Sequence, residues 1–168
     1  MSGLVIGLPL IEDIGNWKKE RISIATGQKG RLMGLDVGES RIGVAFSDPG
    51  RMLAFPFKAI PRSMDENDLL AIGTLASERD VKLIVVGIPT SLDGNLHYQG
   101  LQIAGFLEVL RSSTSIPVEP WGEQFTTAEA ERLLSESGVK PSLDRGRLDA
   151  AAAAVILQDY LDSTREWQ

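Results

Sequence analysis

An almost unbroken apolar run in the middle of the chain, residues 81–88 (VKLIVVGI), is the feature that most restricts its fold. The run is rich in β-branched residues and has the length of a strand rather than that of a helix. Because its apolar residues follow one another instead of alternating with polar ones, both faces of the strand need to be covered. The sequence therefore predicts a sheet with helices on each side, which is the arrangement of an α/β protein.

The other segments supply the rest of this sheet and its covering helices. Short apolar runs between turns predict further strands, and apolar residues at helical spacing predict helices. The predicted strands are 32–38, 41–47, 52–60 and 116–121, and the predicted helices are 65–79, 100–110, 126–134 and about 147–162. Hairpins followed by alternating strands and helices indicate a mixed sheet with helices on both faces. The order of the strands does not follow from these propensities.

The last predicted helix has Asp149 in its first turn, followed by five alanines and Val155-Ile156-Leu157. A helix that is apolar on every side is buried, and alanines allow its backbone to lie close to the element that it covers. Asp149 would gain from the helix dipole in the first turn, which is the simplest explanation for it. An acid ahead of a buried run is unusual for a surface cap, so we favour a functional role.

Composition limits the chemistry that is available. The chain has 168 residues with no cysteine and a single histidine, His97. This excludes disulfide scaffolds, thiolate nucleophiles and cysteine-based zinc or iron–sulfur sites. The remaining groups are mostly carboxylates, whose hard oxygen atoms suit Mg²⁺ or Mn²⁺. Because the net charge of −6 repels nucleic acid, binding to nucleic acid would need a local basic face.

The chain is interpreted as one domain, residues 31–165, preceded by an extension. Residues 1–30 differ from the rest, with a polar segment at 16–21 and a loop-like segment at 27–30, and we assign them no structure. No targeting signal is evident, and the longest later apolar block, 150–157, is far shorter than the roughly 20 residues of a membrane helix. We expect a cytoplasmic protein with no membrane partner.

Three acids at the ends of predicted elements form the candidate site. Asp36 ends the first strand, Glu123 follows the fifth strand, and Asp149 leads the last helix. Each has a simpler explanation, as a turn acid, a solvated loop acid or a helix-dipole acid. Ligand sites gather at the carboxyl ends of parallel strands, so the three could meet and hold one or two Mg²⁺ ions. Two ions about 4 Å apart can activate water and neutralise a phosphodiester's charge without histidine or cysteine.

Four segments of the sequence carry a resemblance to a known family. They are 36–45 (DVGESRIGVA) with Ser47-Asp48-Pro49, 86–89 (VGIP) with Asp93-Gly94, Glu123 with 126–131 (TTAEAE), and 149–161. Together, in this order, they cover about residues 31–162. They resemble the YqgF/RuvX family, the Holliday-junction-resolvase-like pre-16S rRNA nucleases of bacteria.

The resemblance implies a ribonuclease H-like fold with a five-stranded sheet of order 3-2-1-4-5, in which strand 2 is antiparallel. It also implies a two-metal-ion hydrolase, using Mg²⁺ or Mn²⁺, that processes the 5′ end of precursor 16S rRNA in ribosome biogenesis. Asp36, Glu123 and Asp149 are carried over as its catalytic and metal-binding residues. The chain departs from the family at Gly122 and Gln124, where the family usually has Asp and Arg, and the loss of that arginine weakens a phosphate or structural contact.

Nucleic acid is the expected partner, either structured RNA or branched DNA. Arg41, Arg145 and Arg147 are expected to flank the acids and bind phosphates, although an ordinary solvated charge explains each of them as well. Asp93 lies in a loop that borders the site in the family and is a candidate substrate contact, or else a turn residue. A Holliday-junction resolvase would need a two-fold homodimer, whereas an RNA-trimming enzyme could be a monomer.

Two other interpretations stay open. Residues 36–45 also resemble the phosphate loop of actin- and sugar-kinase-like ATPases, but those proteins enclose ATP between two such domains and this chain has the length for one. ATP hydrolysis without nuclease activity would favour that nucleotide-binding function. The other is a non-catalytic nucleic-acid-binding module. The three acids argue against it, and the missing arginine argues for it.

Overall fold

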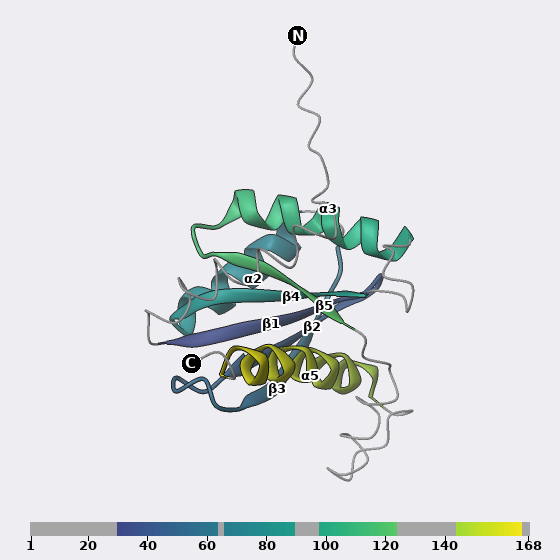
Figure 1. Ribbon diagram of the computed structural model, residues 1–168. Coiled ribbons are helices and arrows are strands. Elements are labelled where there is room, and N and C mark those ends of the chain that lie inside the picture. The colour runs from purple at the N-terminus through teal and green to yellow at the C-terminus, as the bar shows by residue number, and fades with distance from the viewer. Residues whose placement is uncertain (1–29, 64–65, 90–97, 124–143, 166–168) are drawn as a thin grey trace.

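The computed structural model describes residues 30–63, 66–89, 98–123 and 144–165, which contain a single five-stranded sheet (Figure 1). The strand order is β3-β2-β1-β4-β5. β2 is antiparallel to β1 and β3, whereas β4 is parallel to both β1 and β5. The predicted order with an antiparallel second strand is therefore confirmed. The strands are β1 (Arg31–Val37), β2 (Arg41–Ser47), β3 (Ala54–Pro61), β4 (Val81–Pro89) and β5 (Val118–Glu123).

Helices cover both faces of the sheet, as predicted. α2 (Glu66–Glu78) and α3 (Tyr98–Ser113) lie on one face, and α5 (Arg145–Arg165) lies on the other (Figure 1). Alternate residues of β4 enter two separate cores. Ile84 and Val86 pack in the core under α2 and α3, whereas Leu83 and Val85 pack in the core under α5. These four side chains are at most 2% exposed, which confirms that this strand is buried on both faces.

Local hydrogen bonds explain why two strands begin later than predicted. The turn before β3 extends to Leu53 because the Asp48 carboxylate accepts hydrogen bonds from the backbone N–H groups of residues 50, 52 and 53. β5 begins at residue 118 because Pro117 has no N–H to donate, and the N–H of Ile116 donates to the Thr114 hydroxyl instead. β5 also runs on to Glu123, so this acid ends the strand instead of following it.

α5 begins earlier than predicted because Asp144 caps it. Oδ1 of Asp144 accepts a hydrogen bond from the backbone N–H of Arg147 at 3.0 Å, which satisfies an otherwise free amide of the first turn. Asp149 consequently lies in the second turn, and the first turn contains no acid. The predicted first-turn position of Asp149 is wrong, and the helix dipole, which acts mainly within the first turn, does not account for this residue.

α5 lies unusually close to the sheet, because glycines face it on three neighbouring strands. Gly34, Gly43 and Gly87 belong to β1, β2 and β4. A Cβ atom on Gly34 would come within 2.9 Å of the Ala153 carbonyl oxygen, and one on Gly43 would overlap the carbonyl oxygen of Asp149. The alanine-rich helix and these glycines therefore allow one backbone to pack directly on another, as the alanine run predicted.

Several predicted features lie outside the described residues. They are the extension 1–30 apart from Gly30, the helix 126–134 and the loop that contains Asp93. The domain boundaries thus stay a prediction. Within the described ranges, no helix combines the length and the apolar character needed to cross a membrane.

Replacing Gly43 with alanine is expected to lower the free energy of unfolding by about 1–3 kcal/mol, the usual effect of overpacking. The added methyl group would displace the backbone of α5 at Asp149. Gly105→Ala is the matched control, because nothing lies within 4 Å of a Cβ at this α3 position and alanine is the better helix former by about 1 kcal/mol. Urea unfolding should shift in opposite directions for the two variants. A Gly43→Ala variant as stable as wild type would contradict the close approach.

Candidate active site

Asp36 lies near the carboxyl end of β1, the central strand of the sheet, where its backbone pairs with Gly43 of β2. Side chains alternate between the two faces along a strand. Leu32 packs in the core under α5, and Gly34 lies against α5 itself. Asp36 continues this series and therefore faces the α5 side, at the edge where the parallel strands end.

Asp149 reaches the same place from α5. Its carbonyl oxygen lies directly against Gly43, which is the cross-strand partner of Asp36. The two carboxyl groups act on each other electrostatically. Burial and, secondarily, the negative charge of Asp149 raise the pKa of Asp36 to about 6. The structure thus brings together two acids that are far apart in the sequence.

Arg41, the first residue of β2, supplies positive charge beside these two acids. Its Nε donates a hydrogen bond to Oδ2 of Asp149 at 2.5 Å. A charge-assisted hydrogen bond of this kind fixes the orientation of a carboxylate. The side chains of Arg41 and Asp149 are 34% and 26% exposed, so solvent and small ions reach the pair. Arg41 lies next to the acids as expected, and its contact with a phosphate stays a prediction.

Glu123 is the last residue of β5, and its backbone pairs with Pro89 at the end of β4. β1, β4 and β5 are parallel, so Glu123 and Asp36 lie at the same edge of the sheet. β4 separates their strands, which places β5 about 10 Å from β1. The side chain of Glu123 and the whole of Asp93 lie outside the described residues. The participation of both in the site therefore stays a prediction.

Arg145 and Arg147 are exposed residues in the first turn of α5. Nε of Arg147 forms an ion pair with Oδ2 of Asp144 at 3.2 Å. Arg145 precedes Asp149 by four residues, about one turn of the helix, and Arg147 precedes it by two residues, about half a turn. Their contact with a phosphate stays a prediction.

Gly43 and Arg62 contribute to the site in ways that the sequence analysis did not assign. Any side chain at Gly43 would push away the part of α5 that carries Asp149. The available signal was a glycine inside a strand, which marks the close approach of another backbone. Arg62 holds the turn after β1, because its Nη1 donates to the Gly38 carbonyl at 3.0 Å and its backbone N–H donates to the Ser40 carbonyl at 2.9 Å.

The donor set at this place fits a divalent cation. Asp36 and Asp149 present carboxylates from two different elements. Burial and, secondarily, the charge of Asp149 raise the pKa of Asp36, and a cation between the two carboxylates would offset both effects. Within the described part of the chain, no three His, Cys, Asp or Glu side chains gather into a metal-binding group. The pair would therefore need further oxygen ligands from water, from a substrate phosphate or from Glu123.

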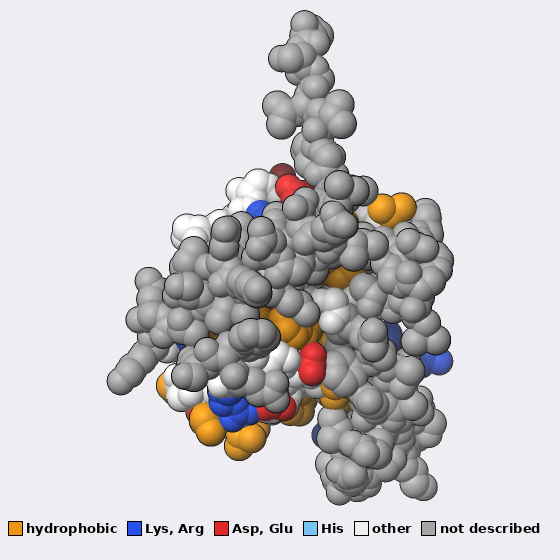
Figure 2. Space-filling model, in the orientation of Figure 1, with side chains coloured by type: hydrophobic (Ala, Val, Ile, Leu, Met, Phe, Trp, Pro, Cys, Tyr) orange, Lys and Arg blue, Asp and Glu red, His pale blue; other side chains and the backbone are white. Residues whose placement is uncertain are grey.

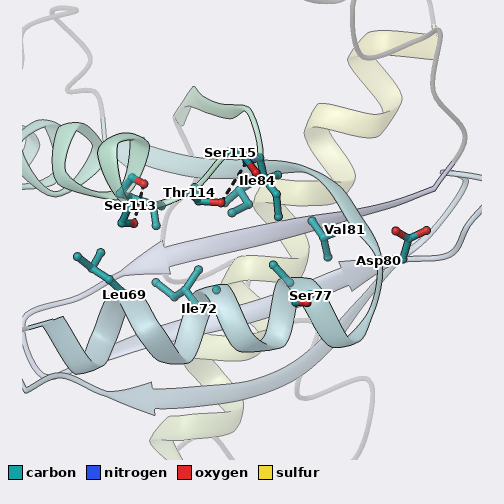
Figure 3. A pocket seen from close by; sticks show the side chains of 13 residues that line it. Leu69, Ile72, Ser77, Asp80, Val81, Ile84, Ser113, Thr114 and Ser115 are labelled. Carbon is teal, nitrogen blue, oxygen red and sulfur yellow. Dashed lines mark hydrogen bonds between the residues drawn. The ribbon is translucent and has the colours of Figure 1, made fainter.

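A cavity of about 460 Å³ on the other face of the sheet does not fit this chemistry (Figure 3). It lies between α2, the start of β4 and the end of α3, away from the carboxyl ends of the strands, and Asp80 is the one acid that lines it. Two lining hydroxyls bond locally. Ser113 donates to the Leu110 carbonyl, and Thr114 accepts from the N–H of Ile116. We therefore place the candidate site on the α5 face.

Comparison with known proteins relates this chain to one family. The family model described as RuvX, Holliday junction resolvase, matches residues 30–163. A candidate pre-16S rRNA nuclease of Roseiflexus sp. (strain RS-1) is 44% identical over 141 residues, which are 82% of this chain and 98% of that protein. Another, of Chloroflexus aggregans (strain MD-66 / DSM 9485), is 41% identical over 134 residues, which are 80% of this chain and 94% of that protein.

One solved structure of similar fold is the Fowlpox virus resolvase in complex with Holliday junction DNA. The TM-score is 0.53 at 9% identity, and the match covers 79% of this chain and 97% of the viral chain. At this identity the similarity concerns the fold alone. Together with the strand order it confirms the predicted ribonuclease H-like fold.

Removing the charge of Asp36 is expected to stabilise the protein at neutral pH. The pKa of Asp36 is about 6 in the folded protein, against an ordinary value of 3.8. The folded state therefore binds the proton more tightly than the unfolded state, so this group's contribution to stability falls as pH rises from about 4 to about 6. Above pH 7 the loss reaches up to about 3 kcal/mol, at about 1.4 kcal/mol per pKa unit.

Urea unfolding of wild type and Asp36→Asn, in buffer containing EDTA, tests this expectation. The variant should be more stable than wild type at pH 7.5, and the difference should shrink towards pH 4, where Asp36 is protonated in the folded protein. A stability difference that does not change with pH would contradict the raised pKa.

Proposed function

Because the chain belongs to the RuvX family of Holliday junction resolvases, we propose that it is a metal-dependent nuclease that hydrolyses phosphodiester bonds. Its relatives carry the name of candidate pre-16S rRNA nucleases. The proposed substrate is accordingly structured RNA at the 5′ end of precursor 16S rRNA, processed in the cytoplasm during ribosome biogenesis. Branched DNA is the second candidate substrate, because the family description names Holliday junction resolvases.

The meeting of Asp36 and Asp149 around Gly43 is the observation that supports this function best. The two acids come from a central strand and from the last helix, and the glycine between them removes the obstacle to their approach. An acid at either position could serve a local purpose alone. Burial and the neighbouring charge raise the pKa of Asp36, so keeping both carboxylates here costs stability. A shifted pKa of this kind favours a catalytic role.

Asp36, Asp149 and Arg41 have different roles in the proposed reaction. Bound at the carboxylates of Asp36 and Asp149, one or two Mg²⁺ or Mn²⁺ ions would activate water and neutralise the charge of the scissile phosphate. Asp36 is ionised at neutral pH, because its raised pKa of about 6 lies below 7. Arg41 holds the Asp149 carboxylate in one orientation and lies where it can donate to a phosphate oxygen.

Glu123 is the proposed third acid. Within β5, Glu119 bonds to Tyr160 of α5 and Trp121 bonds to Asp159 of α5, so residues of this parity face the helix. We therefore expect a carboxylate at position 123 on the same face as Asp36 and Asp149. The arginine that the family usually has next to it is replaced by Gln124, so Arg41, Arg145 and Arg147 are the proposed phosphate ligands. Asp93 is kept as a proposed substrate contact.

The first test concerns the acids. Asp36→Asn and Asp149→Asn should each reduce Mg²⁺-supported hydrolysis of labelled precursor 16S rRNA at least about 100-fold, because losing a metal-binding carboxylate removes several kcal/mol of charge stabilisation. Asp162→Asn is the matched control, an exposed acid at the other end of α5. The same variants are assayed on a four-way DNA junction to distinguish the two substrates. Unchanged activity in both site variants would reject the proposed site.

The arginines at the start of α5 can be tested separately from the chemistry. Log affinity falls as log salt concentration rises. If Arg145 binds a phosphate, Arg145→Gln should make this slope shallower by about 1. Arg165→Gln, at the other end of the same helix, should leave the slope unchanged. Binding is measured by fluorescence anisotropy of a labelled RNA at several salt concentrations. Equal slopes for wild type and Arg145→Gln would exclude Arg145 from the phosphate contacts.

A homodimer is proposed only for the branched DNA substrate. A junction presents two symmetry-related cleavage sites, which two copies of one chain can cut together. An RNA end presents a single site and needs one copy. Light scattering with and without a four-way junction distinguishes these two cases.

A further inference from the structure

Two phenylalanines are exposed on β3, the edge strand of the sheet. Phe55 is 54% exposed and Phe57 is 42% exposed. Met52 and Leu53, in the turn before the strand, are also more than half exposed. In Figure 2, hydrophobic side chains gather at the lower left, where the β2–β3 hairpin lies in Figure 1, next to Lys or Arg side chains. Grouped apolar side chains at a surface mark a binding site more often than scattered ones do.

Cations are interleaved with these aromatic rings. The guanidinium carbon of Arg79 lies 4.2 Å from the ring centroid of Phe57 and 4.8 Å from that of Phe46. Nζ of Lys58 lies 5.5 Å from the Phe57 centroid. Phe46 contacts Phe57 edge to face, with 5.3 Å between the ring centroids, and pairs with Phe55 across the strands. Phe46 and Phe57 thus have positive charge at their faces, and Phe55 lies next to Phe46 on the same face of the sheet.

The edge of β3 is poorly suited to pairing with a strand of another protein. Pro56 and Pro61 lack backbone N–H groups, and Lys58 places a charge on the edge. The pairing of β3 with β2 is also interrupted by an irregularity between Val44 and Ala45. These are the devices by which natural edge strands avoid adding a strand from a second copy. The side chains, rather than the backbone, are therefore the groups available for binding.

This surface lies on the other face of the sheet from the candidate active site, because Phe46, which pairs with Phe55 and contacts Phe57, belongs to the core under α2 and α3. Asp36 pairs with Gly43, and Gly43 pairs with Ala59 of β3, so the three residues form one row across the sheet. Two strand spacings, about 10 Å, separate the first and last residues of this row. Phe55 pairs with Phe46, whose other partner is Met33 near the start of β1, so the phenylalanines lie towards the other end of the strands. A nucleic acid strand leaving the acids passes round the edge at β3 to reach them, so the bases that stack there are several nucleotides from the cleavage site.

We propose that Phe55, Phe57, Lys58 and Arg79 form a platform on which unpaired bases stack in a flank of the substrate that passes round the edge of the sheet. Aromatic rings and arginine planes stack with bases of any sequence, and cations beside them attract the phosphates. Acids are present here as well: Glu78 pairs with Arg79 at 3.5 Å, Asp80 follows Arg79, and Asp48 accepts from the backbone of Met52 and Leu53. The proposal rests on the proposed nuclease function and names its substrate more closely: a structured nucleic acid with a single-stranded flank.

The test compares two synthetic RNA hairpins, one blunt and one with an unpaired flank of eight uridines. Affinities are measured by fluorescence anisotropy in EDTA, so that nothing is cleaved. Phe55→Ala should reduce the preference for the flanked hairpin roughly 10-fold, which is the usual effect of losing one stacked base. Phe55→Trp should retain it. Val109→Ala, which changes a side chain of similar exposure on α3, is the matched control and should also retain it.

A second measurement locates the contact directly. With 5-iodouridine in the flank, irradiation should cross-link the RNA to the β3 segment, and mass spectrometry of the cross-linked peptide should identify Phe55 or Phe57. A flank that cross-links elsewhere, or a preference unaffected by Phe55→Ala, would overturn the platform. Loss of a dimer in Phe55→Ala, seen by light scattering, would assign the surface to a second copy of the chain and also overturn it.

Failure of the platform differs from failure of the nuclease function. If Asp36→Asn and Asp149→Asn abolish cleavage and Phe55→Ala leaves the preference for the flank intact, the platform alone is wrong. If the wild-type protein binds neither hairpin and cleaves no nucleic acid, the proposed function is wrong and the platform is rejected with it.

Discussion

The rest of the structure depends on the contact between α5 and the sheet. Side chains normally separate a helix from the sheet that it covers, but here glycines on β1, β2 and β4 face α5. At Gly43 the approach is so close that the carbonyl of Asp149 fills the space of a side chain. The contact therefore does more than bury apolar surface. It fixes the position of Asp149 over Gly43, the strand partner of Asp36. A longer side chain on a more distant helix would hold its carboxylate less rigidly.

The placement of Asp36 and Asp149 lowers the stability of the fold, and the surrounding residues limit this cost. Burial of Asp36 and, secondarily, its repulsion by Asp149 disfavour its charged form, and the raised pKa of Asp36 expresses this cost as free energy. Arg41 offsets part of the charge by its contact with Asp149. The two cores themselves consist, among the described residues, of hydrophobic side chains.

The sequence indicated more of the architecture than of the geometry. The run at 81–88 correctly predicted a doubly buried strand, because consecutive apolar residues have one physical explanation in a sheet. The order of the strands came from the resemblance, since pairing is a property of the whole chain. The position of Asp36 at the end of a strand followed from its apolar neighbours. The cap at Asp144 and the role of Gly43 could not be found in this way, because each is defined by a partner from a distant part of the chain. For Glu123 the strand position is known and the side chain stays a prediction.

The net charge of −6 places a condition on any binding to nucleic acid. At physiological salt, charges are screened beyond about 8 Å, so the groups beside a bound phosphate count for more than the total. Arg41 contacts Asp149 of α5, and Arg145 and Arg147 lie in the first turn of the same helix. Lys58 and Arg79 lie by the rings on the other face of the sheet. The net negative charge disfavours contacts that depend only on the overall field of the molecule. A substrate of the proposed nuclease would therefore be held by the groups at the site, and selectivity for a particular nucleic acid structure would follow from the same arrangement that makes non-specific binding weak.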